Sequence, residues 1–272
     1  MEHRNKSITN RTIQQKIIDF LRPASRGLIA VDVRVGLGFT SVRLDDGNIG
    51  LAWTAANHSG SCTHEPRAGT LAGSPAGTLL DMLASLNNPL SRSIGLATAN
   101  AIAAGLPRPE TTNIDILQLL NIQASDHVAM VGYFGPLIPT LRLTGCRLDI
   151  IELRTDKPGT LSPDEGRVSL SECSIAIITG TSIVTGTMDG LLSSLGNPRA
   201  VVILGPSTFM RPEVFAGSPV THLSGSRIRN ATAVERIVSE GGGTMILKQH
   251  MDFETICLKP SFRRERAPSH SQ

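Results

Sequence analysis

The sequence predicts an α+β domain followed by an α/β domain that is built on a mostly parallel sheet. Before residue 110, three strand-like runs stand together between helical segments. After residue 126, short β-branched runs alternate with helix-sized intervals, as in right-handed βαβ units. We therefore expect domains at 1–110 and 111–260, with a basic, disordered tail at 261–272.

Helical spacing and turn signals define the first domain. Apolar residues at helical intervals predict a helix from Ile13 to Leu21, which Arg22-Pro23 ends. Glycine- and asparagine-containing turns then separate three strands of an antiparallel meander, expected at 28–35, 39–44 and 49–53. Two helices should follow, the second rich in small residues that allow close packing, at 79–86 and 94–102.

The second domain begins after Leu106-Pro107-Arg108-Pro109, which breaks the preceding helical pattern. A short helix is expected at 113–120. Five strands should then form the sheet, at 127–131, 148–152, 174–179, 200–205 and 244–248. Such a Rossmann-like sheet binds ligands beyond the carboxyl ends of its strands, so the residues there are candidates for a site.

The central candidate is the turn after the run HVAMV at 127–131. Gly132 and Gly135, with Tyr133 and Phe134 between them, allow a tight turn and a close backbone approach to a ligand. Glu152 stands twenty residues beyond Gly132, where a Rossmann-type unit places its ribose-hydroxyl acceptor. Only two glycines are present, so the turn either contacts a nucleotide-like cofactor or merely closes a βα unit.

Glycines and hydroxyl side chains also follow the next two strands. Together they predict a polar, open rim, formed by Thr179, Gly180, Thr181 and Thr187 after one strand and by Gly205, Pro206 and Ser207 after the other. The alternative is that these are simply the small polar residues that turns use.

Composition excludes several classes of function. The 272 residues carry 26 basic and 23 acidic side chains, a net charge of +3, which gives no support for a nucleic-acid partner. No apolar run reaches the roughly 20 residues of a membrane helix, and the amino terminus is polar. We expect a soluble cytoplasmic protein without a membrane partner. The four cysteines form no Cys-x-x-Cys pair, which disfavours a disulfide scaffold or zinc ribbon.

Four motifs together carry a resemblance to a known family. They are SIGLATANAI at 93–102, VGYFGPL at 131–137, ITGTSIVTGTMDGLL at 178–192 and LGPST at 204–208. They resemble a two-domain bacterial and archaeal family whose proposed role is heavy-metal chelation. The resemblance implies an enolase-amino-terminal-like domain before a Rossmann-like domain, with an active site proposed in the cleft between them.

Metal-ligating residue types are densest just after the third strand. His58, Cys62 and His64 lie within seven positions, beside Glu65, and could hold a transition metal such as zinc, nickel, cobalt or copper. The alternative is a solvent loop in which these side chains contact nothing. Asn100, between two alanines of the small-residue helix, must be satisfied if it is buried, so it either ties the domains together or faces the cleft.

Two functions follow from these observations. In the first, the protein binds a heavy metal or a metal chelate in the interdomain cleft, with Cys62 and its neighbours as ligands. In the second, it is a small-molecule enzyme that holds an adenosine-containing cofactor at the strand tips, so that Glu152→Ala would weaken cofactor binding and leave metal content unchanged. The partner is in either case a small molecule or metal chelate, and fold-level analogy favours a homodimer.

Overall fold

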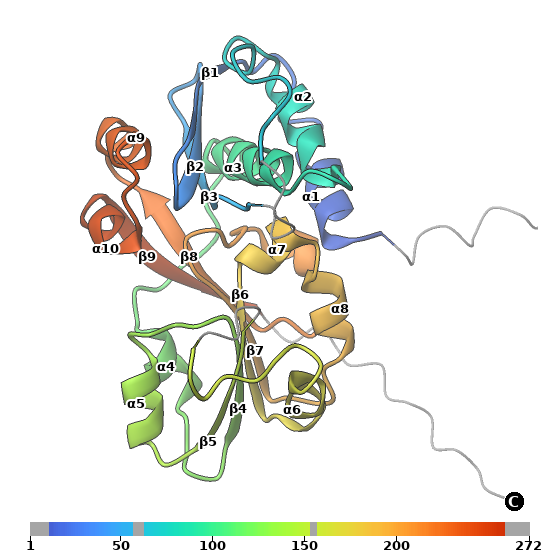
Figure 1. Cartoon of the computed structure of the whole chain (residues 1–272), viewed down its shortest axis with the longest axis vertical. Helices are drawn as coiled ribbons and strands as arrows, with labels where there is room; N and C mark the ends of the chain where they lie inside the picture. Colours follow the sequence, from blue (N-terminus) through green and yellow to red (C-terminus); the bar gives the residue numbers. More distant parts are fainter. Residues whose placement is uncertain (1–10, 57–62, 153–156, 259–272) are drawn as a thin grey trace, which may run out of the picture.

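The computed structural model describes residues 11–56, 63–152 and 157–258. They form a three-stranded antiparallel sheet and a separate six-stranded, mostly parallel sheet, each covered by helices (Figure 1). The predicted combination of an antiparallel and a mostly parallel sheet is therefore confirmed.

The first domain follows the predicted order closely. Helix α1 (Ile13–Leu21) has Thr12 as its N-cap and ends before Pro23. The meander is β1 (Ala30–Val35), β2 (Phe39–Leu44) and β3 (Ile49–Trp53), paired in that order. Two helical segments come next, α2 (Ala76–Asp81) with the 3₁₀ turn η1 (Met82–Ala84), and then α3 (Pro89–Ala104).

The helix expected at 79–86 is shifted toward the amino terminus. It begins at Ala76 and its last turn ends at Ala84, so Leu86 lies beyond it and is 89% exposed. Pro89 accounts for the break, because it starts α3 with Asn88 as the N-cap and disfavours helical backbone just before it. The prediction that this helix extends to Leu86 is therefore wrong.

Close packing of α3 against β3 depends on small residues, as the sequence predicts. A Cβ at Gly50 would lie 2.0 Å from the carbonyl oxygen of Ala97 and 2.2 Å from the amide nitrogen of Ala101. The strand and the helix backbones therefore touch at this point, which only glycine permits. Ala97 and Ala101 are fully buried there.

In the second domain a parallel sheet is bordered by one antiparallel strand. The strand order is β5-β4-β6-β7-β8-β9, and only the β8–β9 pair is antiparallel. The strands are β4 (His127–Val131), β5 (Arg147–Ile151), β6 (Ile175–Thr179), β7 (Ala200–Leu204), β8 (His222–Ile228) and β9 (Met251–Cys257). The helical segments are α4 (Ile116–Leu120), α5 (Ile138–Leu143), α6 (Gly166–Glu172), α7 (Thr181–Thr185), α8 (Met188–Ser193), η2 (Pro212–Phe215), α9 (Ala231–Ser239), α10 (Thr244–Leu247) and η3 (Lys248–His250).

The prediction of a strand at 244–248 is wrong. These residues form α10 and the start of η3, and Met245 and Ile246 are more than half exposed. The last two strands lie on either side of this segment, in β8 and β9. The sequence did not predict these two strands because of their polar residues. For example, β8 carries Ser224, Gly225 and Ser226 in place of a continuous apolar run.

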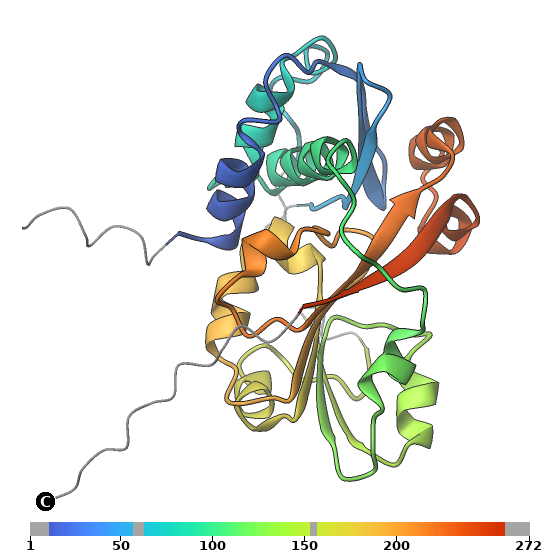
Figure 2. The same ribbon diagram turned by 180° about the vertical axis from the view of Figure 1, so that it is seen from behind.

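Helices α9 and α10 reach back over the first domain (Figures 1 and 2). Val234 and Val238 of α9 form an apolar cluster with Phe39, Ile49 and Leu51 of the first sheet. The meander is thus covered by α3 on one face and by α9 on the other. Residues that the sequence assigns to the second domain complete the core of the first.

A hydrogen-bonded network at the amino-terminal edge of the large sheet fixes neighbouring strands. Asp126 accepts hydrogen bonds from Arg199 (Nη2 at 2.7 Å, Nε at 3.1 Å) and from the Ser174 hydroxyl at 2.7 Å. The Arg199 guanidinium, more than the burial that opposes it, holds the pKa of Asp126 well below its usual range. His127 and His222 also lie at this edge and pair with Asp149 and Thr221 respectively.

We predict that Asp126→Asn lowers stability by about 1–3 kcal/mol near neutral pH, because it weakens a charge-assisted network. The pKa of Asp126 is depressed on folding. Its contribution to the free energy of unfolding is therefore complete above the unfolded-state pKa of about 3.9 and is lost as the pH falls from about 5. Denaturant titrations across this range should show a flatter acid limb in the variant. Asp164→Asn, at an 89% exposed side chain, is the control and should change neither quantity.

Gly50→Ala should destabilise the first domain by about 1–3 kcal/mol or more, because the new methyl group would overlap the α3 backbone. The measurement is the denaturation midpoint. In the matched variant Gly190→Ala, the Cβ meets nothing within 4 Å and lies in exposed α8, so a small gain is expected. Equal midpoints for the two variants would contradict the close contact.

Candidate functional site

The turn after β4 has one strictly required glycine. Gly132 adopts φ 94°, and a Cβ on it would lie 3.0 Å from the Cβ of Thr179 at the tip of β6. Gly135 lies in the same turn without a positive φ. The Tyr133 amide donates to Oε2 of Glu152 at 3.1 Å, so the carboxylate at the tip of β5 holds the turn in place.

Phe134 places its ring over the strand tips. A Cβ on Gly132 would lie 3.7 Å from the ring, and one on Gly205, after β7, would lie 3.8 Å from it. Three loops that are distant in sequence therefore meet here, as the sequence predicts for the ends of parallel strands. Part of the space next to the two glycines is filled by this side chain. The helix that follows, α5, begins at Ile138 and has six residues.

The hydroxyl groups of the rim bond mostly to one another. Thr179 and Thr181 pair through their side chains at 3.0 Å. Thr187 lies farther along, where its hydroxyl pairs with that of Thr185 at 2.8 Å. Gly180 is buried against the next loop, since a Cβ there would lie 2.7 Å from the Thr208 amide nitrogen.

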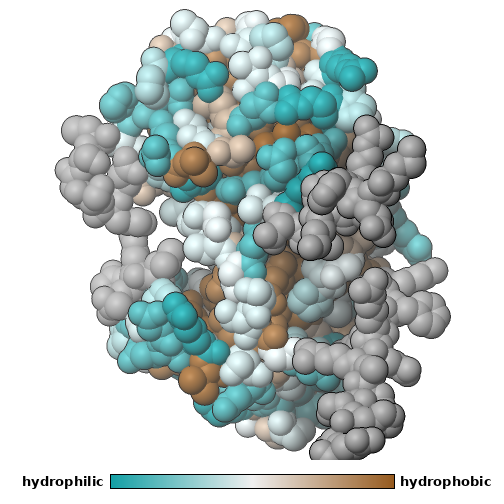
Figure 3. Space-filling model, turned by 90° about the vertical axis from the view of Figure 1, so that its right-hand side faces the viewer, coloured by the Kyte–Doolittle hydropathy of each residue, from teal (hydrophilic) through white to brown (hydrophobic). Residues whose placement is uncertain are grey.

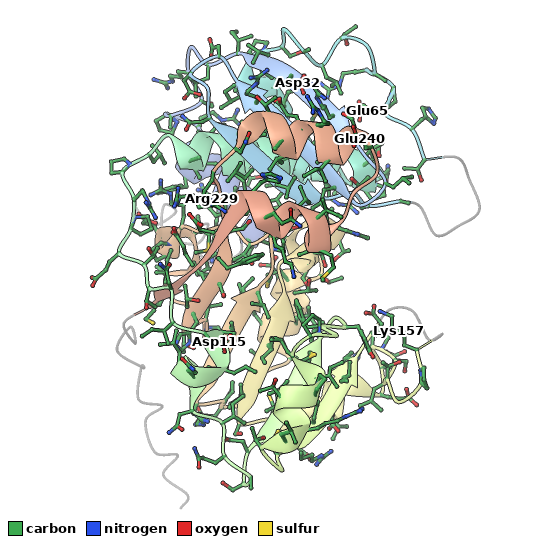
Figure 4. All side chains as sticks on the ribbon, turned by 90° about the vertical axis from the view of Figure 1, so that its left-hand side faces the viewer. Asp32, Glu65, Asp115, Lys157, Arg229 and Glu240 are labelled. Atoms are coloured by element: carbon green, nitrogen blue, oxygen red, sulfur yellow. The ribbon has the colours of Figure 1, made fainter. Side chains whose placement is uncertain are left out.

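Tyr133, in the turn after β4, is 42% exposed. The Nζ of Lys157 lies 4.0 Å from the centre of its ring, within the range of a cation–π contact. Figure 4 shows Lys157 on the second domain, on the side of the molecule opposite to Arg229. The rim with Tyr133 and the surroundings of Arg229 are therefore two separate places.

The second place is a cavity of about 300 Å³ between the two domains. The first domain contributes the start of β3 and the end of α3, and the second contributes the loop after β7 with β8 and β9. Asn100 and Pro206, both predicted as site residues, line it. Asn100 donates a hydrogen bond to the carbonyl oxygen of Leu51 in β3 at 2.9 Å. Its side chain therefore joins α3 to β3 at the border of the cavity.

Of the residues that the structure describes, four arginines and one carboxylate line this cavity. Glu254 accepts hydrogen bonds from Arg108 and Arg227, and these lower its pKa although burial acts to raise it. Arg229 pairs with Asp252 through Nε at 2.9 Å. Figure 4 shows Arg229 at the junction between the domains, beside α10.

The fourth arginine, Arg211, is only 5% exposed. Its Nη1 donates to the Pro107 carbonyl oxygen at 2.7 Å, and its Nη2 donates to the carbonyl oxygen of Ala103 in the last turn of α3. A cation is favoured there by the helix dipole. Burial lowers the pKa of Arg211, and Glu213 opposes this at longer range.

The loop after β7 connects the rim to the cavity. Ser207 accepts a hydrogen bond from the Trp53 amide at 2.8 Å and so joins the tip of β7 to the end of β3. Thr208 lines the cavity and is 2% exposed, with its Oγ1 directed at Gly180 and without a hydrogen-bond partner. One loop thus contacts both candidate places and both domains.

Two of the three predicted metal ligands, His58 and Cys62, lie outside the described residues. His64 is exposed and its carbonyl oxygen accepts from Asn88 at 3.1 Å. Glu65 is buried and accepts from the Ser91 hydroxyl and from Arg67. Within the part of the chain that is described, no three His, Cys, Asp or Glu residues gather to form a metal site.

Sequence reasoning missed the arginines of the cavity. Arg227 and Arg229 are two positions apart, as on one face of a strand, and Asp252 and Glu254 repeat this spacing on the neighbouring strand. That spacing was the available signal. It was not used because β8 and β9 were themselves not predicted, and because Arg108 and Arg211 come from unrelated loops.

Figure 3 shows the hydropathy of one face of the molecule, part of which grey atoms cover. Hydrophilic side chains dominate its upper half, and hydrophobic ones appear in separate areas. Within residues 11–56, 63–152 and 157–258, no helix has the length and apolar character needed to span a bilayer.

Comparisons with known proteins match nearly the whole chain. Two family models described as "Putative heavy-metal chelation" match it, DUF4213 over residues 18–103 and DUF364 over residues 115–257. An uncharacterized protein of Methanocaldococcus jannaschii is 24% identical over 164 residues, a match that spans 58% of this chain and 63% of that relative.

Two solved structures share the fold. A DUF364-family protein of unknown function from Pyrococcus horikoshii has a TM-score of 0.79 at 23% identity, and the match covers 91% of this chain and all of that one. A second, from Desulfitobacterium hafniense, has a TM-score of 0.72 at 24% identity, with coverages of 90% and 99%. At this level of identity the likeness shows the fold alone.

Thr208→Val and Ser207→Ala should change stability in opposite directions. Thr208→Val removes a buried hydroxyl that has no partner and keeps the shape of the side chain, so a gain of about 1 kcal/mol is expected. Ser207→Ala leaves the Trp53 amide without its acceptor and should cost about 1–3 kcal/mol. Unfolding free energies from denaturant titration decide this. Losses of similar size in both variants would contradict the assigned hydrogen bonding.

Proposed function

Because the chain belongs to the DUF364 family, whose model matches more than half of it, we propose that it binds a heavy metal held by a small organic chelator. The site is the cavity between the two domains. The observation that carries this proposal is the cavity itself, since both domains supply its walls and its volume of about 300 Å³ suits a small molecule.

The residue types around the cavity favour a complexed metal over a bare ion. Among the residues that the structure describes, its wall contains four arginines and no histidine or cysteine, so it presents few groups that a transition metal would choose. An organic chelator would supply those ligands, and the cavity would recognise the chelator. The predicted ligands His58, Cys62 and His64 belong to the segment between β3 and α3, whereas the cavity borders the far end of α3, so they would accept the metal from the chelate and would not complete its coordination inside the cavity.

The strand order of the large sheet supports a second candidate function. The order β5-β4-β6 reverses direction at β4, and doubly wound sheets bind ligands in the crevice at such a point. We propose a Rossmann-like assignment for this domain, with an enolase-amino-terminal-like assignment for the meander and its helices. An adenosine-containing cofactor would then contact the turn from Gly132 to Gly135 and the carboxylate of Glu152.

Elemental analysis and native mass spectrometry of protein purified without an affinity tag separate the two candidates. We expect near-stoichiometric metal together with an organic mass, and loss of the metal in Cys62→Ser. Cys257→Ser is the matched control, because Cys257 is an exposed cysteine at the end of β9 that does not line the cavity.

Metal-free protein that retains only an organic ligand would overturn the chelate proposal and favour the cofactor. Unchanged metal content in Cys62→Ser would remove that residue from the set of ligands.

A further inference from the structure

We infer that the ligand of the interdomain cavity is a small organic anion, which the arginines hold by carboxylate or phosphate groups. This inference deepens the proposed function, because it assigns a chemical class to the molecule that the cavity binds. It concerns Arg108, Arg211, Arg227 and Arg229, none of which was predicted as a site residue.

The charges around the cavity do not balance. In the described part of the chain, Glu254 is the single acidic residue of its wall, and Asp252, outside the wall, is the other carboxylate that pairs with these arginines. Three guanidinium groups therefore share two carboxylates, and the fourth, that of Arg211, pairs with neither. Like charges placed this close repel one another, and a bound anion would remove that repulsion.

Arg211 adds a buried cation to this excess. It is 5% exposed, and its hydrogen bonds go to two carbonyl oxygens and to no carboxylate. Buried charges are normally paired with an opposite charge, and Glu213 acts on this guanidinium only through space, so a directly bound anion would be favourable there. Its contacts with the end of α3 also hold it still, which prepares it to bind a ligand without further ordering.

The arginines keep donors for a ligand. A guanidinium group carries five N–H donors in a planar fork, whose geometry matches carboxylate and phosphate oxygens. The hydrogen bonds of Arg229 to Asp252 and to the Gln249 carbonyl oxygen use Nε and Nη2, and those of Arg211 use Nη1 and Nη2. Each group thus has further N–H bonds to offer.

The rest of the wall indicates an organic scaffold and not a bare inorganic ion. Apolar side chains from both domains face the same cavity as two asparagines. These lining residues are Ile49, Leu51, Met210, Ile228 and Ile256, with Asn48 and Asn100. A volume of about 300 Å³ is at the lower end of ligand pockets and admits a compact molecule of this kind.

Isothermal titration of the full-length chain tests the inference with citrate and pyrophosphate as probes and neutral succinamide as the comparison. We expect one of the two anions to bind with one-to-one stoichiometry, and succinamide to show no binding. Affinity should fall as salt is added, because the contact is between charges. Binding of citrate alone would identify a polycarboxylate, and binding of pyrophosphate alone a phosphorylated compound.

Arg229→Gln should weaken binding of the anion about tenfold or more, since it removes a charge-assisted hydrogen bond. Arg167→Gln is the matched control, because Arg167 is an exposed, ion-paired arginine outside the cavity, and it should bind as the parent does. Arg229→Gln retains the Asp252–Arg227 pair, so the fold is expected to persist, and its denaturation midpoint verifies this.

Failure of both anions to bind at millimolar concentration, or equal affinity of Arg229→Gln and the parent, would overturn the inference. It is separable from the proposed function. Anion binding by protein that never acquires metal would uphold the inference and refute chelate binding. Metal uptake that Arg229→Gln leaves unchanged, with no anion bound, would do the reverse.

Discussion

The hydrogen bond from the Trp53 amide to the Ser207 side chain joins the last strand of the first sheet to the tip of β7. The rest of the interdomain arrangement depends on the loop that supplies this contact. The same loop continues to Arg211, which binds the end of α3, so both the strand and the helix of the first domain are held by residues 207–211. On the other side of the molecule, the Asp189 carboxylate accepts from the Ile13 amide at 3.1 Å, and Arg92 donates to the Val184 carbonyl oxygen. The walls of the cavity are consequently fixed in relation to one another.

A rigid frame matters for a site that gathers like charges. Four guanidinium groups would move apart if their backbone were free to move, and the cavity would lose its concentration of positive charge. Here Arg227 is held by the paired strands β8 and β9, Arg229 just beyond β8 is held by its backbone hydrogen bond to His250, and Arg211 is held by the α3 terminus. The free energy of folding offsets the repulsion before any ligand arrives. Sites of this kind bind with little reorganisation, because their geometry is already set.

Much of the fold could be predicted from the sequence, since it depends on local patterns. The helix at 13–21, the meander and four strands of the large sheet follow from apolar spacing and turn residues, and their bounds agree with the structure to within about two residues. The strand predicted at 244–248 fails because a short apolar run does not distinguish a helix from a strand. The sequence pattern did not predict β8 and β9, because polar cross-strand pairs, here Arg227 with Asp252, replace the apolar alternation of a typical strand. The rim of strand tips could be predicted, because parallel topology places those residues together. The cavity could not be predicted, because its arginines come from a linker, a loop and a strand whose proximity is decided by tertiary packing.

The chain crosses between the domains more than once, and this affects how the protein can be synthesised. The first sheet receives its second cover only when α9 has left the ribosome, more than 120 residues after the first domain ends at α3. Until then Phe39, Ile49 and Leu51 have no partners on that face. A nascent chain that has completed α3 is therefore an unfinished domain with an open apolar surface, and the amino-terminal half is a poor unit for separate expression.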